Sequence, residues 1–502
     1  MTVKAKADAI DRFVRTLKSG GLYDDINAAC VMAGWTNLAG ALYPLKGSAP
    51  TNNGFLAADL DAGIGLQGDA SSYLNSNRNS NADPQDDYHA AVWVSKADSG
   101  SSGAMYLGSG GPGITGSTNI GSTTDLASPD TIFRSRSATS DIIASSASST
   151  GLIALSRSVG GSYGYRSGSL FGSKTRASET PANANYFVFS RNLSGTPSLP
   201  TDATLSWYSI GSSTDLAALD SAVSTLMADL RAIDEDGFEP ESVNYLRAVE
   251  AADGAYLETG VKQAINSFIV GLKKDNLWNA LKASCILCGA RTIAGALVPL
   301  AGTAPTAYGG WSSGDYNRET GLKGNGTTKY LNSNHLASSQ YTNDTHFAVW
   351  HSEVSTTGLP SGYGVSIGCA SKVIATGLNS FSMIRLNQSL DQWVFYVNSA
   401  NALSGTGGSP NSTGFMGASR SDATNVTYRR NGASGVGAIA SQDHAENAPY
   451  GVFQTLFTNF AGQTFPTDAR IAFYSIGSAI ADLAPLDARV TTLVSQIAAA
   501  IP

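Results

Sequence analysis

The sequence predicts a mainly β protein made of two tandem β-sandwiches, each flanked by short amphipathic helices. Motifs from the first half of the 502-residue chain recur in the same order in the second half. Apolar residues at helical spacing begin and end each half, and short β-prone runs separated by Gly, Ser and Asn turns fill the middle. Together these observations indicate one domain that occurs twice.

The internal duplication rests on colinear matches along the whole chain. The helical pattern at 10–17 recurs 255 positions later, and the YLNSN motif at 73–77 recurs at 330–334. The YSIGS motif at 208–212 recurs 266 positions later, at 474–478. Matches of this extent do not arise by chance, and the growing offset places the net insertions in loops.

The offsets also predict the domain boundaries. The segment between the copies is not rich in Gly and Ser and contains a helical stretch, so we expect a structured connector and not a flexible tether. The predicted segments are a first copy at 1–234 (helical lead-in about 5–34, β-sandwich about 35–212, closing helix about 213–233), a helical connector at 235–260, and a second copy at 261–502 (helical lead-in about 261–289, β-sandwich about 290–478, closing helix about 479–501).

Each lead-in is expected to contain two helices. Ile10, Phe13 and Leu17 lie on one face of an α-helix, and the same face recurs in the second copy. A second short helix is expected at about 23–33 and again at about 277–288.

The body of each copy carries strand signals. Residues 91–95 and 347–351 are short apolar runs, and residues 392–398 are aromatic and strongly β-prone. The Asn-Gly pair at 431–432 is the strongest kind of short hairpin signal. Short strands with such turns over about 180 residues indicate a sandwich or a jelly roll.

Composition excludes several classes of function. Charged residues are only 14% of the chain, the net charge is −7, and no basic run could neutralise phosphates, so nucleic-acid binding is not expected. The apolar runs are far shorter than the roughly 20 residues that span a bilayer, so membrane insertion is not expected. The first residues lack the apolar core of a signal peptide, which predicts synthesis in the cytoplasm without classical export.

No metal or cofactor site is predicted. Cys285 and Cys288 form a C-x-x-C, but a zinc site needs four ligands, so the four cysteines (Cys30, Cys285, Cys288 and Cys369) are expected to be small buried thiols, with the lead-in thiols on helices. The acidic loop at 83–87 offers oxygens to calcium, but the second copy replaces it.

No catalytic residue is predicted either. A glycan hydrolase needs two carboxylates roughly 5–9.5 Å apart, and no strand carries an alternating acidic pattern. The nearest acidic cluster, at 234–241, is expected to be a solvated loop between the copies. His346 and His351 are expected on opposite faces of one strand, since a separation of five is odd in a period of two, which excludes a shared metal site. We therefore expect that the protein is not an enzyme.

The stretch at 245–305, followed by YNRETGLKGNGTTKYLNSN at 316–334, resembles virion or tail-associated proteins of tailed bacteriophages, whose sandwich is similar to the concanavalin A-like lectin/glucanase fold. The resemblance covers nearly the whole chain, once per copy. It is most specific in the helical lead-in and in GL-x-G-x-x-x-x-x-YLNSN, and loose in the later strands. It implies tandem concanavalin A-like jelly-roll domains and a place in the phage particle.

A glycan contact is one alternative within this resemblance. Lectin-like sandwiches hold sugars with loop aromatics, Asn and Asp, and one loop of the second copy offers such a mixture, although packing of that loop against the sandwich also explains it. The candidate residues are Tyr308, Trp311, Asp315, Tyr316 and Asn317.

Two functions follow from these observations. The first is a structural virion protein, displayed as a decoration, fibre or tail-associated subunit, that contacts other virion proteins and self-associates into a homo-oligomer. Low charge suits a surface that other subunits cover. The alternative is a receptor-binding adhesin that recognises host-surface polysaccharide through its loops.

We predict that Phe268→Asp destabilises the second copy by several kcal/mol, because the substitution buries an unpaired charge on the apolar face of the helix. Thermal unfolding of the purified variant measures the loss, and unchanged melting would show that this face is not buried.

Overall fold

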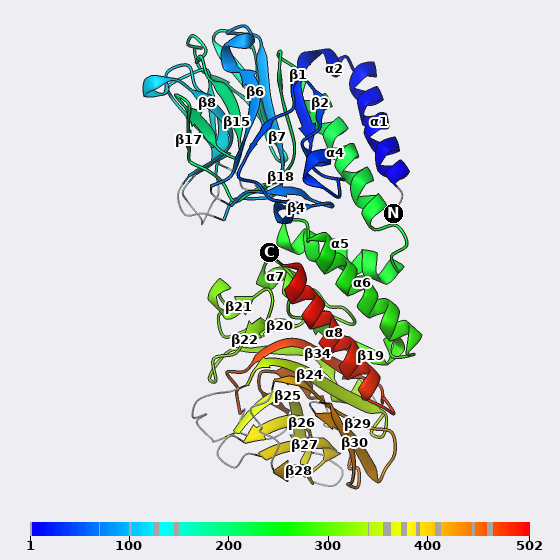
Figure 1. Cartoon of the computed structure of the whole chain (residues 1–502). Helices are drawn as coiled ribbons and strands as arrows, with labels where there is room; N and C mark the ends of the chain where they lie inside the picture. The colour runs from blue at the N-terminus through cyan, green and yellow to red at the C-terminus, as the bar shows by residue number, and fades with distance from the viewer. Residues whose placement is uncertain are drawn as a thin grey trace. The chain divides into compact units, whose positions relative to one another are not determined.

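The protein is mainly β and divides into two compact units, which Figure 1 shows. The first unit consists of Met1–Gly237 and Gly254–Thr259, and the second of Phe238–Asp253 and Gly260–Ile501. Each unit contains two β-sheets that enclose an apolar core, which confirms the predicted mainly β class of two tandem sandwiches flanked by amphipathic helices. The computed structural model describes residues 3–69, 71–99, 103–123, 130–144, 150–339, 341–354, 363–372, 379–387, 392–406, 413–430, 432–443, 447–458 and 465–501.

The first unit has the following elements. Its helices are α1 (Val3–Ser19), α2 (Leu22–Asp25), α3 (Leu38–Ala41), η1 (Ala57–Asp59), η2 (Ser80–Ala82), η3 (Pro112–Ile114) and α4 (Leu216–Asp234). Its strands are β1 (Ile26–Val31), β2 (Pro44–Lys46), β3 (Thr51–Asn53), β4 (Leu60–Asp61), β5 (Gly65–Gln67), β6 (Tyr73–Asn79), β7 (Tyr88–Lys96), β8 (Ala104–Gly110), β9 (Thr118–Ser122), β10 (Thr131–Ser135), β11 (Asp141–Ile143), β12 (Gly151–Val159), β13 (Ser162–Ser167), β14 (Leu170–Thr175), β15 (Asn185–Val188), β16 (Arg191–Leu193), β17 (Thr196–Ser198) and β18 (Thr204–Gly211).

The second unit repeats this order. Its helices are α5 (Pro240–Asp253), α6 (Thr259–Lys274), η4 (Trp278–Ala280), α7 (Ile293–Ala296), η5 (Ser313–Asp315), η6 (Ala337–Ser339) and α8 (Ala484–Ala500). Its strands are β19 (Leu281–Ile286), β20 (Thr306–Tyr308), β21 (Tyr316–Asn317), β22 (Gly321–Lys323), β23 (Tyr330–Leu336), β24 (Thr345–Glu353), β25 (Tyr363–Lys372), β26 (Asn379–Asn387), β27 (Gln392–Ser399), β28 (Leu403–Thr406), β29 (Gly414–Arg420), β30 (Asn425–Arg430), β31 (Ala433–Ala438), β32 (Pro449–Val452), β33 (Thr455–Thr458) and β34 (Arg470–Gly477).

The two units share their sheet topology. The first sheet runs β14-β13-β12-β7-β18-β1-β2 in one unit and β31-β30-β29-β24-β34-β19 in the other, and β8 with β15, β6 and β3 corresponds to β25 with β32, β23 and β20. Cys30 of β1 lies opposite Tyr208 of β18, and Cys285 of β19 lies opposite Tyr474 of β34. Among the described strands, pairing is antiparallel except for β16 with β8 and β33 with β25.

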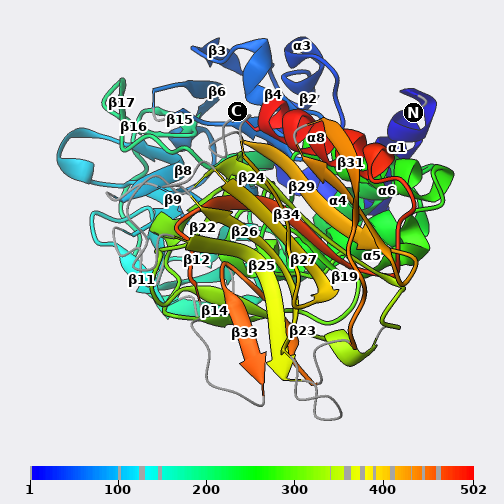
Figure 2. The same cartoon turned by 90° about the horizontal axis from the view of Figure 1, so that it is seen from below.

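In each unit, a layer of helices covers the outer face of one sheet (Figure 1). We call this sheet, which contains β7 and β18 in the first unit and β24 and β34 in the second, the central sheet. In the first unit, Leu17 of α1 and Val223 of α4 share an apolar cluster with Trp207 of β18. In the second unit, the ring of Phe268 in α6 lies 5.7 Å from that of Phe473 in β34, and α8 lies alongside β29 (Figure 2). The central strands are therefore buried on both faces.

Burial on both faces explains the sequence pattern of the central strands. Trp207 belongs to the cluster under the helices, whereas its neighbour Tyr208 belongs to the core between the sheets. Successive side chains alternate between two apolar layers, so every residue of β18 is buried, and its few polar positions hold the small hydroxyl residues Thr204, Ser206 and Ser209.

The predicted short helices at 23–33 and 277–288 are wrong. The helix α2 ends at Asp25, and the turn η4 ends at Ala280, and each is followed by a strand, β1 or β19, that pairs with the last strand of its unit. A short apolar run buried on both faces has no period that distinguishes a strand from a helix. Cys30 and Cys285 consequently lie on strands and not on helices.

The hairpin predicted around 431–432 is present. Strands β30 and β31 are antiparallel neighbours, with Arg430 opposite Ala433; of the two residues between them, Asn431 lies outside the described residues.

The sequence Ser-Arg-Ser at 156–158 recurs at 419–421, and each copy buries this arginine between its sheets. Arg157 on β12 donates to the carbonyl of Ser135 on β10 (2.9 Å), and Arg420 on β29 donates to the carbonyl of Val397 on β27 (2.9 Å). Both arginines are fully buried. These bonds tie one sheet of the sandwich to the other.

Three histidines are also fully buried. His89 and His346 occupy matching positions, and the Nδ1 of each donates to a backbone carbonyl, of Ser212 or Ser478, at 2.6 Å. His351 contacts Ser366 of the opposite sheet (2.7 Å), so it faces away from His346, as the odd spacing predicted. Burial lowers the pKa of His89 and lowers the pKa of His346 and of His351 to about 4.

None of the helices within the described residues combines the length and the hydropathy that crossing a bilayer requires.

Acid should destabilise both units. Because the folded state keeps these histidines neutral, the unfolded chain binds their protons first, and the free energy of unfolding should fall as the pH falls from about 6.5 to about 4, by at most about 1.4 kcal/mol per pH unit for each histidine. Melting between pH 8 and pH 4 tests this. The His346→Asn variant retains an amide donor for Ser478 and should have a shallower slope; an unchanged slope would contradict the prediction.

Candidate functional site

The five residues nominated for glycan contact lie close together in sequence in the second unit, in and between β20 and β21 (Tyr308, Trp311, Asp315, Tyr316 and Asn317). The matching segment of the first unit runs from β3 to β4. Strand β3 pairs with β6 as β20 pairs with β23, and β4 pairs with β5 as β21 pairs with β22. Each side chain can therefore be compared with a counterpart in the other copy.

The two central aromatics of this segment pack inward. Trp311 lies against the sandwich core, with its ring centroid 5.3 Å from that of Phe453. In the first unit Phe55 occupies the same position, with its ring centroid 4.8 Å from that of Phe189. Tyr316 also packs against the core, and its hydroxyl donates to a backbone carbonyl 2.7 Å away. These rings stabilise the loop.

The two polar candidates hold backbone turns. Asp315 accepts a hydrogen bond from the amide of Ser312 (2.7 Å), and Asn317 accepts one from the amide two residues later (2.9 Å). Asp59 and Asp61 accept the corresponding bonds in the first unit, at 2.6 and 2.7 Å. Because the same bonds occur in both copies, these side chains belong to the fold.

The carboxylate of Asp315 also forms an ion pair. The Nζ of Lys329 lies 2.6 Å from it, and both side chains are largely buried. Burial alone would raise the pKa of Asp315, but the hydrogen bonds from Lys329 and Ser312 outweigh burial and hold the pKa below its ordinary value. The carboxylate is therefore charged and already neutralised.

Tyr308 differs from the other four candidates. Its side chain is 43% exposed, and its ring stacks on that of Tyr330 with centroids 4.7 Å apart and planes 7° apart. The first unit has Asn53 opposite Tyr73 at this position. Tyr308 is thus the one nominated residue that presents an exposed ring without a structural counterpart in the first copy.

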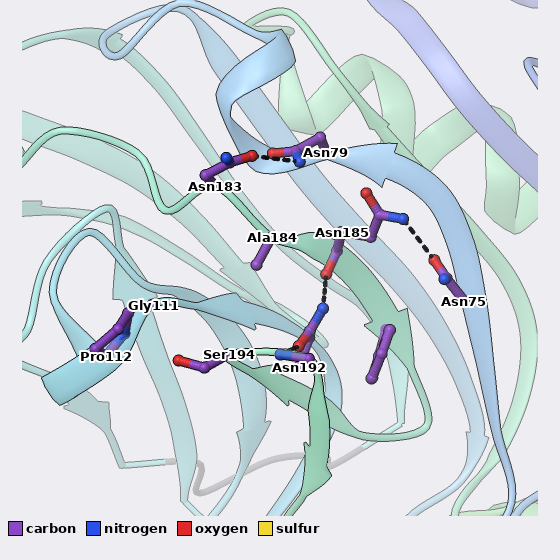
Figure 3. Close-up of a pocket in the computed structure, with 11 residues that line it drawn as sticks. Asn75, Asn79, Gly111, Pro112, Asn183, Ala184, Asn185, Asn192 and Ser194 are labelled. Carbon is purple, nitrogen blue, oxygen red and sulfur yellow. Dashed lines mark hydrogen bonds between the residues drawn. The ribbon is translucent and has the colours of Figure 1, made fainter.

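The first unit contains a pocket that the sequence did not nominate. It has a volume of about 580 Å³ and lies where β6, β15 and the β16–β17 turn meet the loop after β8 (Figure 3). Pockets of this size are typical of small-ligand sites. Its lining residues are Asn75, Asn79, Gly111, Pro112, Asn183, Ala184, Asn185, Phe187, Asn192, Ser194 and Gly195.

Asparagine amides dominate the lining and hold one another in place. Asn79 donates to the side-chain oxygen of Asn183 (2.9 Å), and Asn185 donates to that of Asn75 (3.2 Å), as Figure 3 shows. Asn192 donates to the backbone carbonyl of Asn185 (2.9 Å). The amides therefore have defined positions before any ligand arrives, which lowers the entropic cost of binding.

The network leaves hydrogen-bonding groups unused. Within the described part of the chain, the Nδ2 groups of Asn75 and Asn183 have no acceptor, and the Oδ1 of Asn185 has no donor. A neutral amide presents both donors and an acceptor. The pocket consequently offers both kinds of group to a polar ligand.

Phe187 and Pro112 add apolar surface to the lining. The centroid of the Phe187 ring lies 4.6 Å from that of the Tyr73 ring, and only 5% of Phe187 is exposed. An apolar wall beside several amides is a common composition for a ligand pocket.

A bulge in the YLNSN motif sets the geometry of β6. Asn77 has a left-handed φ of 56°, and four residue steps of β6 lie opposite two of β15, so that Asn79 faces Asn185 and Asn75 faces Phe187. Asn334 has the same φ of 56° and a matching bond, since Asn77 and Asn334 each donate to a carbonyl 2.9 Å away. Asparagine tolerates this conformation better than most residues.

The second unit keeps this backbone but loses most of the amides. Strand pairing places Leu336, Pro449 and Leu456 where the first unit has Asn79, Asn185 and Asn192. Asn332 matches Asn75 in this pairing, and Asn447 lies two residues before Pro449, as Asn183 lies two residues before Asn185. The fold therefore does not require the amides that are lost, and a further role is needed to explain them.

The acidic segments are committed to ion pairs. The expectation of a solvated loop at 234–241 is wrong for its first residues, because Asp234 is buried beside Lys6 (3.1 Å) and Glu235 is buried beside Arg231 (2.8 Å). The carboxylate of Asp83 is likewise buried and pairs with Arg78, which uses one of the three carboxylates in the loop considered for calcium.

The thiols are sealed from solvent. Burial raises the pKa of Cys285 and of Cys288 to about 12, so both stay protonated, and neither is bridged. Among the described residues no group of three His, Cys, Asp or Glu side chains could hold a metal ion. The expectation that the protein is not an enzyme stays a prediction.

Trp311→Ala should lower the free energy of unfolding of the second unit by about 2 kcal/mol, because it removes a ring that packs against Phe453. Tyr308→Ala, at an exposed site, should change it by less than about 0.5 kcal/mol. Urea unfolding of both variants measures the difference, and equal effects would show that Trp311 does not support the core.

No family model matches this sequence, and neither does any curated protein. Solved structures that are similar include the NanB sialidase from Streptococcus pneumoniae (11% identity, 31% of this chain and 26% of that chain, TM-score 0.25) and mouse laminin alpha1 chain domains LG4-5 (9%, 79% and 84%, 0.21). Another is full-length tailspike protein 2 from Escherichia coli O157:H7 bacteriophage CAB120 (11%, 38% and 26%, 0.23). The chain spans about a quarter of the sialidase and tailspike chains. At these TM-scores, the fold assignment rests on the sheet topology alone.

Proposed function

We propose that this chain is a carbohydrate-binding component of a bacteriophage particle and that the asparagine pocket of the first unit holds a glycan of the host surface. The observation that carries the binding role is the pocket itself, with its ordered amides and unused donors and acceptor. The place in the particle is supported by the sequence resemblance of 245–305 and 316–334 to tail-associated proteins.

Sugar chemistry suits this lining. Each hydroxyl of a sugar both donates and accepts a hydrogen bond, and the pocket presents the Nδ2 of Asn75 and the Oδ1 of Asn185 as one donor and one acceptor from a bonded pair. The C–H faces of a sugar ring are apolar and match the surface of Phe187 and Pro112. The pocket thus favours the adhesin over a purely structural role.

A structural role for the second unit is the other candidate. Its matching surface carries Leu336, which is 39% exposed, and the partly buried Leu456 in place of amides, and apolar side chains favour contact with protein over contact with sugar. In this proposal the second unit contacts other subunits of the particle, or further copies of the chain, while the first unit binds the glycan.

Binding of the full chain to an array of bacterial surface polysaccharides tests the proposal. We expect saturable binding that Asn192→Leu weakens at least tenfold, because this change removes one amide of the network and introduces the residue of the second unit. Tyr308→Ala is the control and should bind normally.

A chain with native melting that binds no polysaccharide on the array would contradict the proposed function. Loss of binding in Tyr308→Ala but not in Asn192→Leu would move the site to the second unit. Release of reducing ends during the assay would show that the protein is an enzyme.

A further inference from the structure

We infer that the asparagine pocket selects uncharged sugars, such as hexoses and N-acetylhexosamines, over acidic ones, and that each chain has one such site. This inference rests on the proposed function of the pocket and names its ligand class. The argument depends on which charges surround the amides and on the contrast between the two copies.

No charged side chain lines the pocket: its eleven lining residues are Asn, Gly, Ala, Pro, Phe and Ser. The nearest arginines along the chain have other partners. Arg78, which precedes Asn79, pairs with the buried carboxylate of Asp83. Arg191, which precedes Asn192, donates to the hydroxyl of Ser198 (3.0 Å) and is only 9% exposed. Neither guanidinium lines the pocket.

An acidic sugar would meet an unfavourable environment here. Its carboxylate would lose water and gain only neutral amide donors, and burial of a charge without an opposite charge is costly. Proteins that recognise carboxylates commonly supply an arginine, whose two parallel N–H groups match the two oxygens. The lining of this pocket contains no such group.

An uncharged sugar can use every group that the lining leaves open. The Nδ2 of Asn75 and the Oδ1 of Asn185 suit one hydroxyl or a neighbouring pair, and the Nδ2 of Asn183 suits a further oxygen. Phe187 and Pro112 can contact the C–H face of the ring or the methyl of an acetamido group. All of these contacts are neutral, so the match needs no counter-ion.

The second unit indicates one site per chain. At the positions of Asn185 and Asn192 it has Pro449 and Leu456, neither of which supplies a side-chain hydrogen bond. The Oδ1 of Asn332 still accepts a hydrogen bond from the backbone amide two residues later (2.9 Å), as the Oδ1 of Asn75 does (3.0 Å). Both copies therefore have the turn, but the pocket is described only in the first unit. Substitution of Asn75 affects the turn and the pocket, whereas substitution of Asn332 affects the turn alone.

Titration calorimetry of the full chain tests the inference with defined probes. The neutral probes are lactose, maltose and N,N′-diacetylchitobiose, and the acidic probes are α2,3-sialyllactose, which is lactose with one added acidic residue, and a uronic acid disaccharide. We expect at least one neutral probe to bind with one site per chain and every acidic probe to bind at least tenfold more weakly. Asn75→Ala should weaken binding at least tenfold, and its matched control, Asn332→Ala, should not.

Each of the other outcomes contradicts one part of the inference. Preferential binding of an acidic probe, lost in Asn75→Ala, overturns the neutral selectivity and leaves the proposed function intact. Two sites per chain, or equal losses in Asn75→Ala and Asn332→Ala, overturn the single site. Binding of no neutral probe overturns the inference, and the polysaccharide array then decides independently whether the proposed function survives.

Discussion

Burial of the central sheet on both faces is the constraint on which the rest of each unit depends. Trp207 lies under the helices and Tyr208 lies between the sheets, so one strand contributes to two apolar layers. The outer layer is completed by α1 and α4, which explains why helices accompany the sandwich. With this scaffold rigid, the edges and loops of the opposite sheet are free to differ between the copies.

The duplication separates residues that build the fold from residues that do not. Buried groups recur with their bonds, as His89 and His346 do at their carbonyls and as Arg157 and Arg420 do between the sheets. By the same comparison, four of the five residues nominated for glycan contact stabilise the fold: Trp311, Asp315, Tyr316 and Asn317. Three of the five pocket asparagines, Asn79, Asn185 and Asn192, do not recur, and this is the strongest argument that they serve a ligand.

Much of the fold was predictable from the sequence, because helical spacing and colinear motifs are local or repeated signals. The amphipathic face around Phe13 and the hairpin at β30 and β31 follow from such signals. The strand β1 was mistaken for a helix because burial on both faces erases its period. The pocket was missed because its amides come from separate segments, and because YLNSN, which supplies Asn75, is identical in both copies.

The left-handed bulge at Asn77 and Asn334 has a consequence for how such a domain changes its partner. Both copies have the same kinked backbone at this corner, so the geometry that presents a ligand-facing side chain already exists in each of them. Exchange of a few side chains on this preformed corner therefore converts an apolar patch into a polar cradle, or the reverse, without any rearrangement of strands. A tandem pair of this kind can diversify one member while the other retains its original contacts.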